Sequence, residues 1–399
     1  MCGIVGVLGK HEAAPLLVEA LKRLEYRGYD SAGIATVDDG VLDRRRAVGK
    51  LVNLSDLLVH EPLAGKAGIG HTRWATHGAP NVVNAHPHRA GPVAVVHNGI
   101  IENFRELRSE LAEAGRHCET ETDTETIALL VQLHLDEGLT HAEAAARAIA
   151  RLEGAFALAL LFEGQDDLII VARRGSPLAI GHGDDEVFVG SDAMALAPMT
   201  DRITYLEEGD WACLSRSRIE IRDAAGKPVT RPVRKVQIDL SQVEKGGHRL
   251  FMAKEIAEQP VVLGDALAHY LRGEEIELPV PAPDFSGFDR VIMVACGTAS
   301  YACLVAKYWF EQLAGMPVEV DIASEFRYRK PLIGPRTLAL FVSQSGETAD
   351  TLAALRYCEG KAAIIAEVVN VTESSIARES DIVLPIRAGA EIGVASTKA

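Results

Sequence analysis

Hydrophobic and polar positions in the first part of the chain alternate between short apolar runs and helical spacing. The run that starts at Ile4 predicts a buried strand. Residues 12–28 carry apolar positions three and four apart and end in a glycine, which predicts a helix. The apolar run 93–96 predicts a strand that stops at His97, before another helix. From residue 155 to 231, strands separated by Gly and Asp turns predict a largely antiparallel sheet system between helical layers.

The pattern changes from Phe288 onward. Residues 288–315 place an apolar strand, a turn of small residues and a long helix in succession, and residues 338–358 repeat this order. Further apolar strands are predicted within 317–326, 362–370 and 381–389. Strands that alternate with helices favour a parallel, doubly wound sheet.

Length and composition favour more than one folded domain. The chain has 399 residues, of which 48% are hydrophobic, enough for sizeable cores. Residues 228–260 mix proline, glycine and charge, and we place the domain junction near 238–250. We predict an α+β domain at 1–240, a linker with helices at 241–285, and an α/β domain at 286–399.

Charge narrows the classes of partner. The net charge is −15, which argues against a nucleic-acid or anionic-membrane surface, because either needs a basic footprint. No apolar stretch reaches the roughly 18 residues that cross a bilayer.

The six cysteines are dispersed with no CxxC pair, so we expect no disulfide framework, no zinc site and a reducing cytoplasm. No cluster has metal-ligand spacing, and we expect no metal or organic cofactor.

Cys2 is the first candidate for chemistry. If an aminopeptidase removes Met1, Cys2 carries both a thiol and a free α-amine. The thiol titrates near ~8.5 and the amine near ~7.7–8.0, so the amine can accept the thiol proton directly or through water. Gly3 lets substrate approach the sulfur closely. The alternative is a small hydrophobic residue near a retained Met1.

Three further side chains suit the binding of a small amino acid. Arg73 follows an apolar run and can bind a carboxylate through two parallel N–H donors, and Trp74 can cover such a site. For each residue taken alone, the alternative is favoured: a surface ion pair for Arg73 and a core aromatic for Trp74. Asp123 can bind an ammonium or cap the helix predicted after it, with Thr124 and Glu125 as further capping candidates.

Asn98 and Gly99 are candidates for an oxyanion hole. They are predicted at the point where the strand turns toward the next helix. A side-chain amide and a backbone N–H are the donor types that stabilise a tetrahedral oxyanion. An Asn-Gly hairpin turn is the alternative, but a helix rather than a returning strand is predicted next.

Two turns of the second half suit an anion. The turns CGTAS (296–300) and SQSGET (343–348) each follow a strand and precede a helix. In doubly wound sheets ligands bind at the carboxyl ends of strands, and hydroxyls with N–H groups at a helix start can bind phosphate. Plain N-capping by Ser and Thr is the alternative.

Six motifs of the first half occur together: Cys2, LEYRGYDSAG (24–33), HTRWATHG (71–78), NAHPH (84–88), HNGIIEN (97–103) and ETDTE (121–125). This set resembles the N-terminal-nucleophile glutamine amidotransferases, with the closest match to the glutamine–fructose-6-phosphate aminotransferase family. The resemblance implies an αββα sandwich in which Cys2 attacks the amide carbon of glutamine. It also implies glutamine-binding roles for Arg73, Trp74, His77 and Asp123, with Trp74 as a gate residue, and an oxyanion hole at Asn98 and Gly99.

The second half resembles a sugar isomerase (SIS) domain. This resemblance implies a phosphate site, and a sugar pocket lined in part by Val394 and Ser396; the phosphate site comprises Thr298, Ser343, Gln344, Ser345 and Thr348. The implied reaction passes ammonia from glutamine to fructose 6-phosphate and forms glucosamine 6-phosphate, the first step of hexosamine biosynthesis. The family also implies a homodimer.

The chain stops at Ala399, whereas the family continues through a second SIS lobe that supplies acid/base residues and a Schiff-base lysine. We therefore expect a complete glutaminase half and an incomplete synthase half. A phosphoribosyl or asparagine acceptor is disfavoured by the SIS-like turns. A non-catalytic sensor of glutamine and a sugar phosphate is the alternative from another class.

Overall fold

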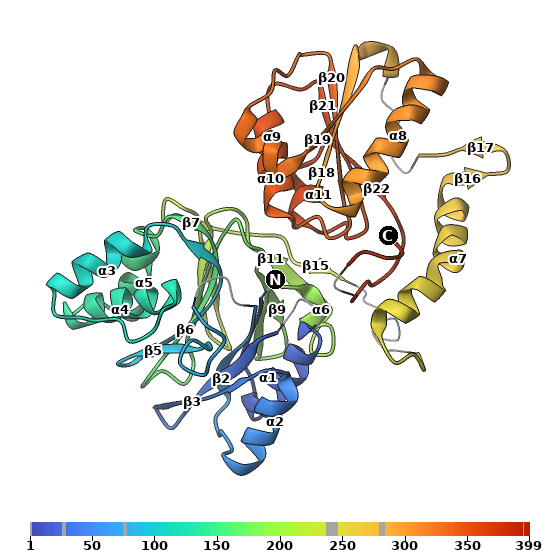
Figure 1. The fold of residues 1–399 in the computed structure, drawn as a ribbon. Coiled ribbons are helices and arrows are strands. Elements are labelled where there is room, and N and C mark those ends of the chain that lie inside the picture. Colours follow the sequence, from blue (N-terminus) through green and yellow to red (C-terminus); the bar gives the residue numbers. More distant parts are fainter. Residues whose placement is uncertain (1, 26–28, 75–77, 237–245, 279–283, 394) are drawn as a thin grey trace. The chain divides into compact units, whose positions relative to one another are not determined.

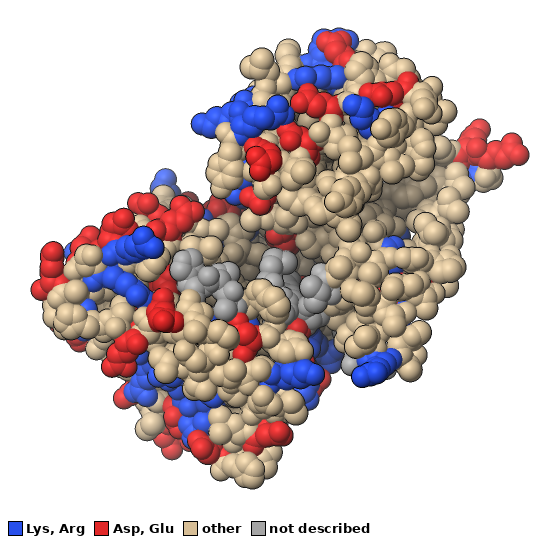
Figure 2. All heavy atoms as spheres, in the orientation of Figure 1, with Lys and Arg blue, Asp and Glu red and all other residues tan. Residues whose placement is uncertain are grey.

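The computed structural model describes residues 1–399 apart from 1, 26–28, 75–77, 237–245, 279–283 and 394. The chain divides into two units, Met1–Leu240 and Ser241–Ala399, and we describe each unit by itself (Figure 1). On the face drawn in Figure 2, acidic and basic side chains are interspersed in both units. Within the described residues, no helix has the length and apolar character needed to cross a membrane.

The first unit contains two antiparallel sheets. The eight-stranded sheet has the order β15-β11-β9-β10-β1-β4-β2-β3, and its strands are β1 (Gly3–Leu8), β2 (Ser31–Asp38), β3 (Val41–Val48), β4 (Ala67–Arg73), β9 (Ala179–His182), β10 (Val187–Gly190), β11 (Arg202–Tyr205) and β15 (Arg234–Lys235). The seven-stranded sheet has the order β14-β13-β12-β8-β7-β6-β5, and its strands are β5 (His88–Ala90), β6 (Val93–Ile101), β7 (Gly154–Phe162), β8 (Ile169–Arg174), β12 (Trp211–Leu214), β13 (Ile219–Arg222) and β14 (Pro228–Val229).

Within the described residues of this unit, six helices cover the outer faces of the two sheets. They are α1 (Ala13–Lys22), α2 (Leu51–His60), α3 (Phe104–Glu113), α4 (Asp123–Asp136), α5 (His141–Ile149) and α6 (Ala193–Leu196). One core cluster joins side chains from both sheets, such as Ile4 of β1 and Val171 of β8. A second cluster packs α3, α4 and α5 on the seven-stranded sheet, and a third packs α1, α2 and α6 on the other sheet. These αββα layers, visible in Figure 1, confirm the predicted fold class.

Alternation along β1 shows why this strand lies between two layers. Ile4 and Leu8 point into the core between the sheets, whereas Val5 and Val7 pack with the helices on the outer face. Successive side chains of a strand leave on opposite faces, so a continuous apolar run marks a strand that is buried on both sides. All six residues of β1 are buried.

Two local predictions differ from the structure. The first helix ends at Lys22 rather than near residue 28, and residues 26–28 lie outside the described residues. Thr124 and Glu125 do not cap α4, because α4 begins at Asp123 and Thr122 holds the N-cap position. Their side chains bond elsewhere: Thr124 contacts His97, and Glu125 accepts the backbone N–H groups of residues 119 and 120.

The second unit contains a five-stranded parallel sheet with the order β19-β18-β20-β21-β22. Its strands are β18 (Arg290–Ala295), β19 (Val318–Ile322), β20 (Thr337–Ser343), β21 (Ile364–Val369) and β22 (Ile382–Pro385). Its helices are α7 (Phe251–Tyr270), α8 (Thr298–Ala314), α9 (Ala323–Arg329), α10 (Ala349–Cys358) and α11 (Ser375–Glu379), with a 3-10 turn at Phe285–Gly287 and a hairpin of β16 (Leu271–Arg272) and β17 (Glu275–Ile276).

Two apolar layers sandwich this parallel sheet. One face packs against α9, α10 and α11, and the other packs against α8. Helices on both faces of a parallel sheet define a doubly wound fold and confirm the prediction for this half.

Phe326 of α9 offers a test of this core. Its side chain is fully buried. We expect Phe326→Ala to lower the unfolding free energy of the second unit by about 3–5 kcal/mol, because truncation removes apolar burial and leaves a cavity. Hydrogen exchange during denaturant titration measures this loss by unit, and the exposed Tyr328→Ala variant on the same helix is the control. Equal loss in both variants would contradict the assignment.

Candidate active site

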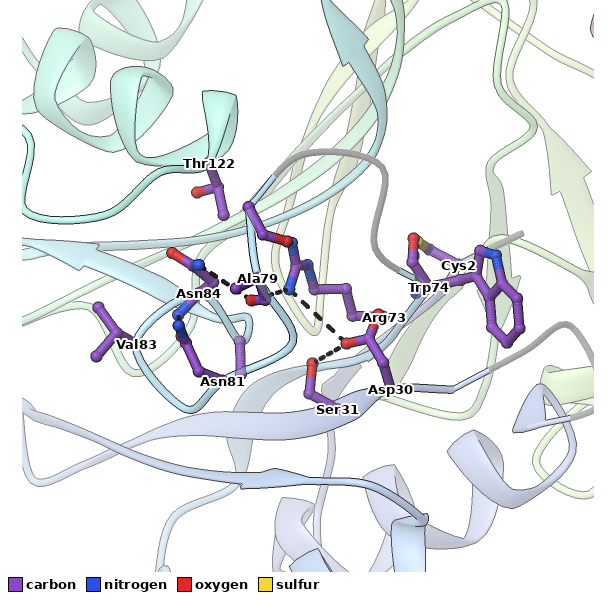
Figure 3. A network of polar contacts seen from close by, with 12 residues as sticks. Cys2, Asp30, Ser31, Arg73, Trp74, Ala79, Asn81, Val83, Asn84 and Thr122 are labelled. Carbon is purple, nitrogen blue, oxygen red and sulfur yellow. Dashed lines mark hydrogen bonds and ion pairs between the residues drawn. The ribbon is translucent and has the colours of Figure 1, made fainter.

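Cys2 lies at the start of the central strand of the eight-stranded sheet. The pairing of β1 with β4 sets Gly3 opposite Thr72, so the residue before Gly3 lies beside the chain that leaves β4. Accordingly, the Trp74 N–H donates to Cys2 Sγ at 3.2 Å, and Sγ lies 3.5 Å from the Trp74 carbonyl oxygen (Figure 3). A Cβ on Gly3 would lie 2.7 Å from both Leu24 and Thr72, so only glycine fits next to the cysteine.

The environment of Cys2 favours the thiol over the thiolate. Burial raises the pKa of the Cys2 thiol, while the Trp74 N–H and the charge of Arg73 lower it to a smaller extent, and Asp30 raises it. The net effect raises the pKa, so the sulfur holds its proton at neutral pH. Any nucleophilic use of this sulfur therefore needs a nearby base.

Asn98, on β6 of the seven-stranded sheet, also contacts Cys2. Its Nδ2 donates to the Cys2 carbonyl oxygen at 3.1 Å, and its Oδ1 lies 3.0 Å from His71 Nε2. His71 Nε2 also lies 3.0 Å from the His97 carbonyl oxygen. A carbonyl oxygen can only accept, so Nε2 carries the proton and donates to both oxygens. His71 thereby fixes which end of the Asn98 amide faces Cys2.

The structure corrects the predicted location of Asn98 and Gly99. β6 does not stop at His97 but continues through Ile101, so both residues lie within the strand rather than at a strand-to-turn point. Gly99 has φ 126°, and a Cβ there would lie 2.0 Å from the Ala155 carbonyl oxygen. The strand can pass this point only with glycine.

Arg73 ends β4 with its guanidinium buried among oxygen atoms. It donates to the carbonyl oxygens of Gly78 at 3.1 Å and Ala79 at 3.4 Å, and it lies 3.7 Å from Asp30 Oδ1 (Figure 3). Ser31 donates to the same Asp30 oxygen at 2.7 Å. Trp74, the next residue, leaves its side chain 53% exposed.

Asp123 is the first residue of α4 and lies beside β6. Its Oδ2 accepts the Ile101 N–H at 2.8 Å and lies 3.9 Å from His97 Nδ1. Asp123 is buried, and its carboxylate lies beside the strand that carries Asn98. The structure thus joins Cys2, Trp74 and Asn98 by direct contacts and places Arg73 and Asp123 on adjoining elements. His77 lies outside the described residues.

Four buried histidines lie near Cys2, and no role was predicted for them: His71, His86, His88 and His97. His71 and His86 have ring centroids 4.2 Å apart, and His86 and His88 have centroids 4.8 Å apart. Thr122 contacts His88 Nε2 at 3.0 Å, and Thr124 contacts His97 Nδ1 at 3.0 Å. The alternating threonines of ETDTE are the sequence signal for this cluster, because Thr122 contacts His88 and Thr124 contacts His97.

Burial keeps this histidine cluster neutral. Desolvation lowers the pKa of His71 to about 3. It also lowers the pKa values of His86, His88 and His97, the last opposed by Asp123. Neighbouring histidine rings and the charge of Arg73 lower the pKa of His86 further. The charges of Arg46 and Arg44, and to a smaller extent Arg73 and His71, lower the pKa of His88 further.

Arg44 and Arg46 of β3 form hydrogen bonds with the backbone of the segment that carries His86 and leads to His88. Arg46 donates to the carbonyl oxygens of Val83 at 3.0 Å and Ala85 at 2.9 Å, and Arg44 donates to that of Pro87 at 2.9 Å. Burial lowers the pKa of Arg46 to about 10, so it stays charged at neutral pH.

In the second unit, the two predicted turns lie at one edge of the sheet. β18 and β20 are neighbouring parallel strands, so Thr298 and the loop 343–348 leave from the same end. Ser343 Oγ accepts the Gly346 N–H at 2.9 Å, and Ser345 Oγ accepts the Glu347 N–H at 3.2 Å. These two hydroxyls therefore shape the loop itself.

Capping does not account for the remaining hydroxyls of these turns. Thr348 holds the N-cap position of α10 without a side-chain capping bond, and the N-cap position of α8 is Gly297. Gly346 has φ 60°, and a Cβ there would lie 1.8 Å from Ser374 Oγ, so the loop is closed against the start of α11. Ser396 Oγ donates to Glu391 Oε2 at 3.0 Å, and Val394 lies outside the described residues.

Comparison with known proteins defines the class. A glutamine amidotransferase domain model matches residues 82–198, and an SIS domain model matches residues 285–399. The solved glutamine phosphoribosylpyrophosphate amidotransferase of B. subtilis superposes with TM-score 0.50 at 20% identity, over 92% of this chain and 81% of that chain, which shows the fold alone. The two matched models define the class: a glutamine amidotransferase domain followed by an SIS domain.

Curated relatives then identify the family. The glutamine–fructose-6-phosphate aminotransferase [isomerizing] of Brucella abortus is 60% identical over 406 residues, and those of Mesorhizobium japonicum and Zymomonas mobilis are 58% and 57% identical. Each match covers 100% of this chain and 66% of the relative. The chain belongs to the glutamine–fructose-6-phosphate aminotransferase family and spans about two thirds of the length of these relatives.

The neutral histidine cluster predicts acid sensitivity. His71 titrates near ~6.5 when unfolded and at about 3 when folded, so below the unfolded pKa the unfolded state binds more protons. Stability contributed by His71 is complete above pH ~6.5 and is lost as the pH falls toward 3, by about 2 kcal/mol at pH 5. Denaturant unfolding of the full chain between pH 7 and pH 5 measures this loss.

His71→Gln keeps an N–H donor for Asn98 and removes the titrating ring, so we expect its pH slope to be shallower by about one proton. His60→Gln, at the exposed end of α2, is the control and should keep the slope. If the His71 variant kept the slope as well, the assignment of the acid loss to this ring would be wrong.

Proposed function

We propose that this chain hydrolyses glutamine at Cys2 and binds fructose 6-phosphate in its SIS unit, as part of an enzyme that forms glucosamine 6-phosphate. One observation carries the first half of the proposal: the Trp74 N–H and the Asn98 amide, fixed by His71, converge on Cys2. The family membership of the whole chain supports the second half.

The base for Cys2 is its own α-amine. While Met1 is attached, the Cys2 nitrogen is an amide and cannot accept a proton. Removal of Met1 creates an amine that takes the thiol proton, directly or through water. Burial raises the thiol pKa, so an internal base is required, and the Trp74 N–H stabilises the thiolate as it forms.

The thiolate sulfur then bonds to the amide carbon of glutamine, and the carbonyl oxygen becomes an oxyanion. Asn98 Nδ2 and the Gly99 N–H stabilise this charge. The protonated amine returns its proton to the leaving nitrogen, the carbon–nitrogen bond breaks and ammonia departs. Water cleaves the resulting thioester, which releases glutamate and regenerates the thiol.

Opposite charges on two elements hold the amino-acid end of glutamine. Arg73 binds its α-carboxylate through parallel N–H donors, and Asp123 binds its α-ammonium. Trp74, half exposed next to the sulfur, covers the site and gates the path of ammonia. His77 completes the glutamine-binding set expected from the resemblance.

The loop 343–348 binds the phosphate of fructose 6-phosphate together with Thr298. Backbone N–H groups at the start of α10 and hydroxyls of the two turns supply donors without a cluster of basic residues. Ser396 and Val394 line the sugar pocket. We infer that the complete enzyme is a cytoplasmic homodimer that binds neither nucleic acid nor membranes and uses no cofactor.

Substitution of the nucleophile tests the glutaminase proposal. We expect Cys2→Ala to lower glutamate release by roughly 10³-fold or more, because no other group on the site can form the thioester. A coupled glutamate assay measures the rate, and circular dichroism with thermal unfolding verifies the fold. The matched control is Cys213→Ala, at a half-buried thiol of β12.

Intact mass and adduct mapping separate catalysis from sensing. The active chain should lack one methionine, and a glutamine analogue with an electrophilic diazoketone should add to Cys2 alone. A retained methionine with glutamine binding but no turnover would favour the sensor, and labelling of a different residue would remove the mechanism.

The charge assignments predict a change in glutamine affinity. We expect Arg73→Lys to raise KM for glutamine more than it lowers kcat, with kcat/KM lower by about 10–100-fold, because lysine cannot form the two parallel bonds. Arg45→Lys, whose arginine pairs with Asp43 and Glu61, should leave both constants unchanged. A fall in kcat alone would assign Arg73 to a different step.

A further inference from the structure

We propose that Glu255 of α7 is a positioning residue that holds the segment 391–398 as a wall of the sugar-phosphate site. The inference rests on the proposed function of the SIS unit. Glu255 lies within the predicted linker with helices at 241–285, and none of the glutaminase steps proposed above involves it. The contacts of Glu255 and of two neighbours carry the inference.

The segment that follows β22 lies at the same sheet edge as the phosphate loop. β20, β21 and β22 are parallel neighbours and therefore end at one edge. Asn370, just after β21, links the two regions: its N–H donates to the Gln344 carbonyl oxygen at 3.3 Å, and its side chain donates to the Gly389 carbonyl oxygen at 2.7 Å. The Ala388 N–H donates back to Asn370 Oδ1 at 2.8 Å.

Glu255 holds the other end of this segment. Its carboxylate is 2% exposed, and Oε1 accepts the N–H groups of Ile392 and, at 2.8 Å, of Gly393. Thr397 Oγ1 donates to Oε2 at 3.3 Å. A Cβ on Gly393 would lie 2.4 Å from Oε2, so the backbone approaches the carboxylate as closely as glycine allows. One buried carboxylate thus closes the segment into a loop.

Glu391 completes the loop from within. Its Oε1 accepts the N–H groups of Thr397 at 2.6 Å and Lys398 at 2.9 Å, and its Oε2 accepts the Ser396 hydroxyl. Lys398 donates to Glu258, one turn after Glu255 on α7, at 2.7 Å. The orientation of the Ser396 hydroxyl therefore depends on a backbone path that α7 fixes.

Glutamine at position 255 should preserve this path. The Oε1 position accepts both backbone N–H groups in the native chain, and an amide oxygen can do the same. The amide NH₂ can then donate to the Thr397 hydroxyl. Alanine removes every acceptor and leaves two buried backbone donors without partners, which costs enough free energy to displace the segment.

Calorimetric titration of the full chain with fructose 6-phosphate and with inorganic phosphate tests the inference. We expect Glu255→Ala to weaken fructose 6-phosphate by about 10-fold or more and inorganic phosphate by less than about 2-fold, because the loop 343–348 stays intact. Glu255→Gln should bind both ligands within about 3-fold of the unsubstituted chain. Glu311→Ala, which removes an exposed carboxylate paired with Lys307 on α8, is the matched control.

Amide hydrogen exchange gives a second readout. The Ile392 and Gly393 amides should be protected in the native chain and in Glu255→Gln, and exposed in Glu255→Ala. Unchanged fructose 6-phosphate affinity in Glu255→Ala, or equal losses for both ligands, would overturn the positioning role. If the unsubstituted chain bound neither ligand, the proposed function of this unit would fail first, and the inference with it.

Discussion

The register between β1 and β4 is the constraint on which the glutaminase site depends. It sets Gly3 opposite Thr72 and thereby places the sulfur of Cys2 against the backbone of Trp74. A shift of one residue would send every side chain of β1 to the opposite face, and a strand buried on both sides cannot tolerate this. The same apolar packing that stabilises the unit therefore also positions the sulfur of Cys2, the proposed nucleophile.

The second requirement is an uncharged support behind Cys2, the proposed nucleophile. The neighbouring rings of His71, His86 and His88 carry no charge at neutral pH, since burial disfavours their protonated forms. A charged ring beside Asn98 would repel Arg73 and would lose its value as a fixed single-proton donor. Neutral histidine is suited to this place because it presents one N–H in a known direction from a rigid ring. The Thr122 hydroxyl contacts Nε2 of His88, at the other end of this histidine cluster.

Much of the architecture could be predicted from residue patterns, but fewer of the contacts between the site residues could. Apolar runs and helical spacing correctly predicted a largely antiparallel sheet system between helical layers and a parallel sheet in the second half, because burial on one or two faces leaves a clear periodicity. The division of the first half into two sheets was implied by the family resemblance. Asn98 and Gly99 were located wrongly, since an Asn-Gly pair signals a turn locally and only long-range pairing with β7 keeps it in a strand. The role of Glu255 was not predictable, because its partners lie more than 130 residues away.

The two units solve one problem, the placement of backbone donors, by opposite means. In the first unit the sheet register supplies the geometry, and a single ring, His71, sets the one rotatable amide. In the second unit the segment after β22 has no ladder to fix it, so buried carboxylates from Glu255 and Glu391 gather its N–H groups instead. An ionised acceptor forms shorter and stronger bonds than a neutral one, and it can hold several donors at once. Buried carboxylates therefore fix the backbone of a segment that no strand pairing holds. In this way α7, which lies outside the sheet, helps to position a wall of the proposed sugar-phosphate site.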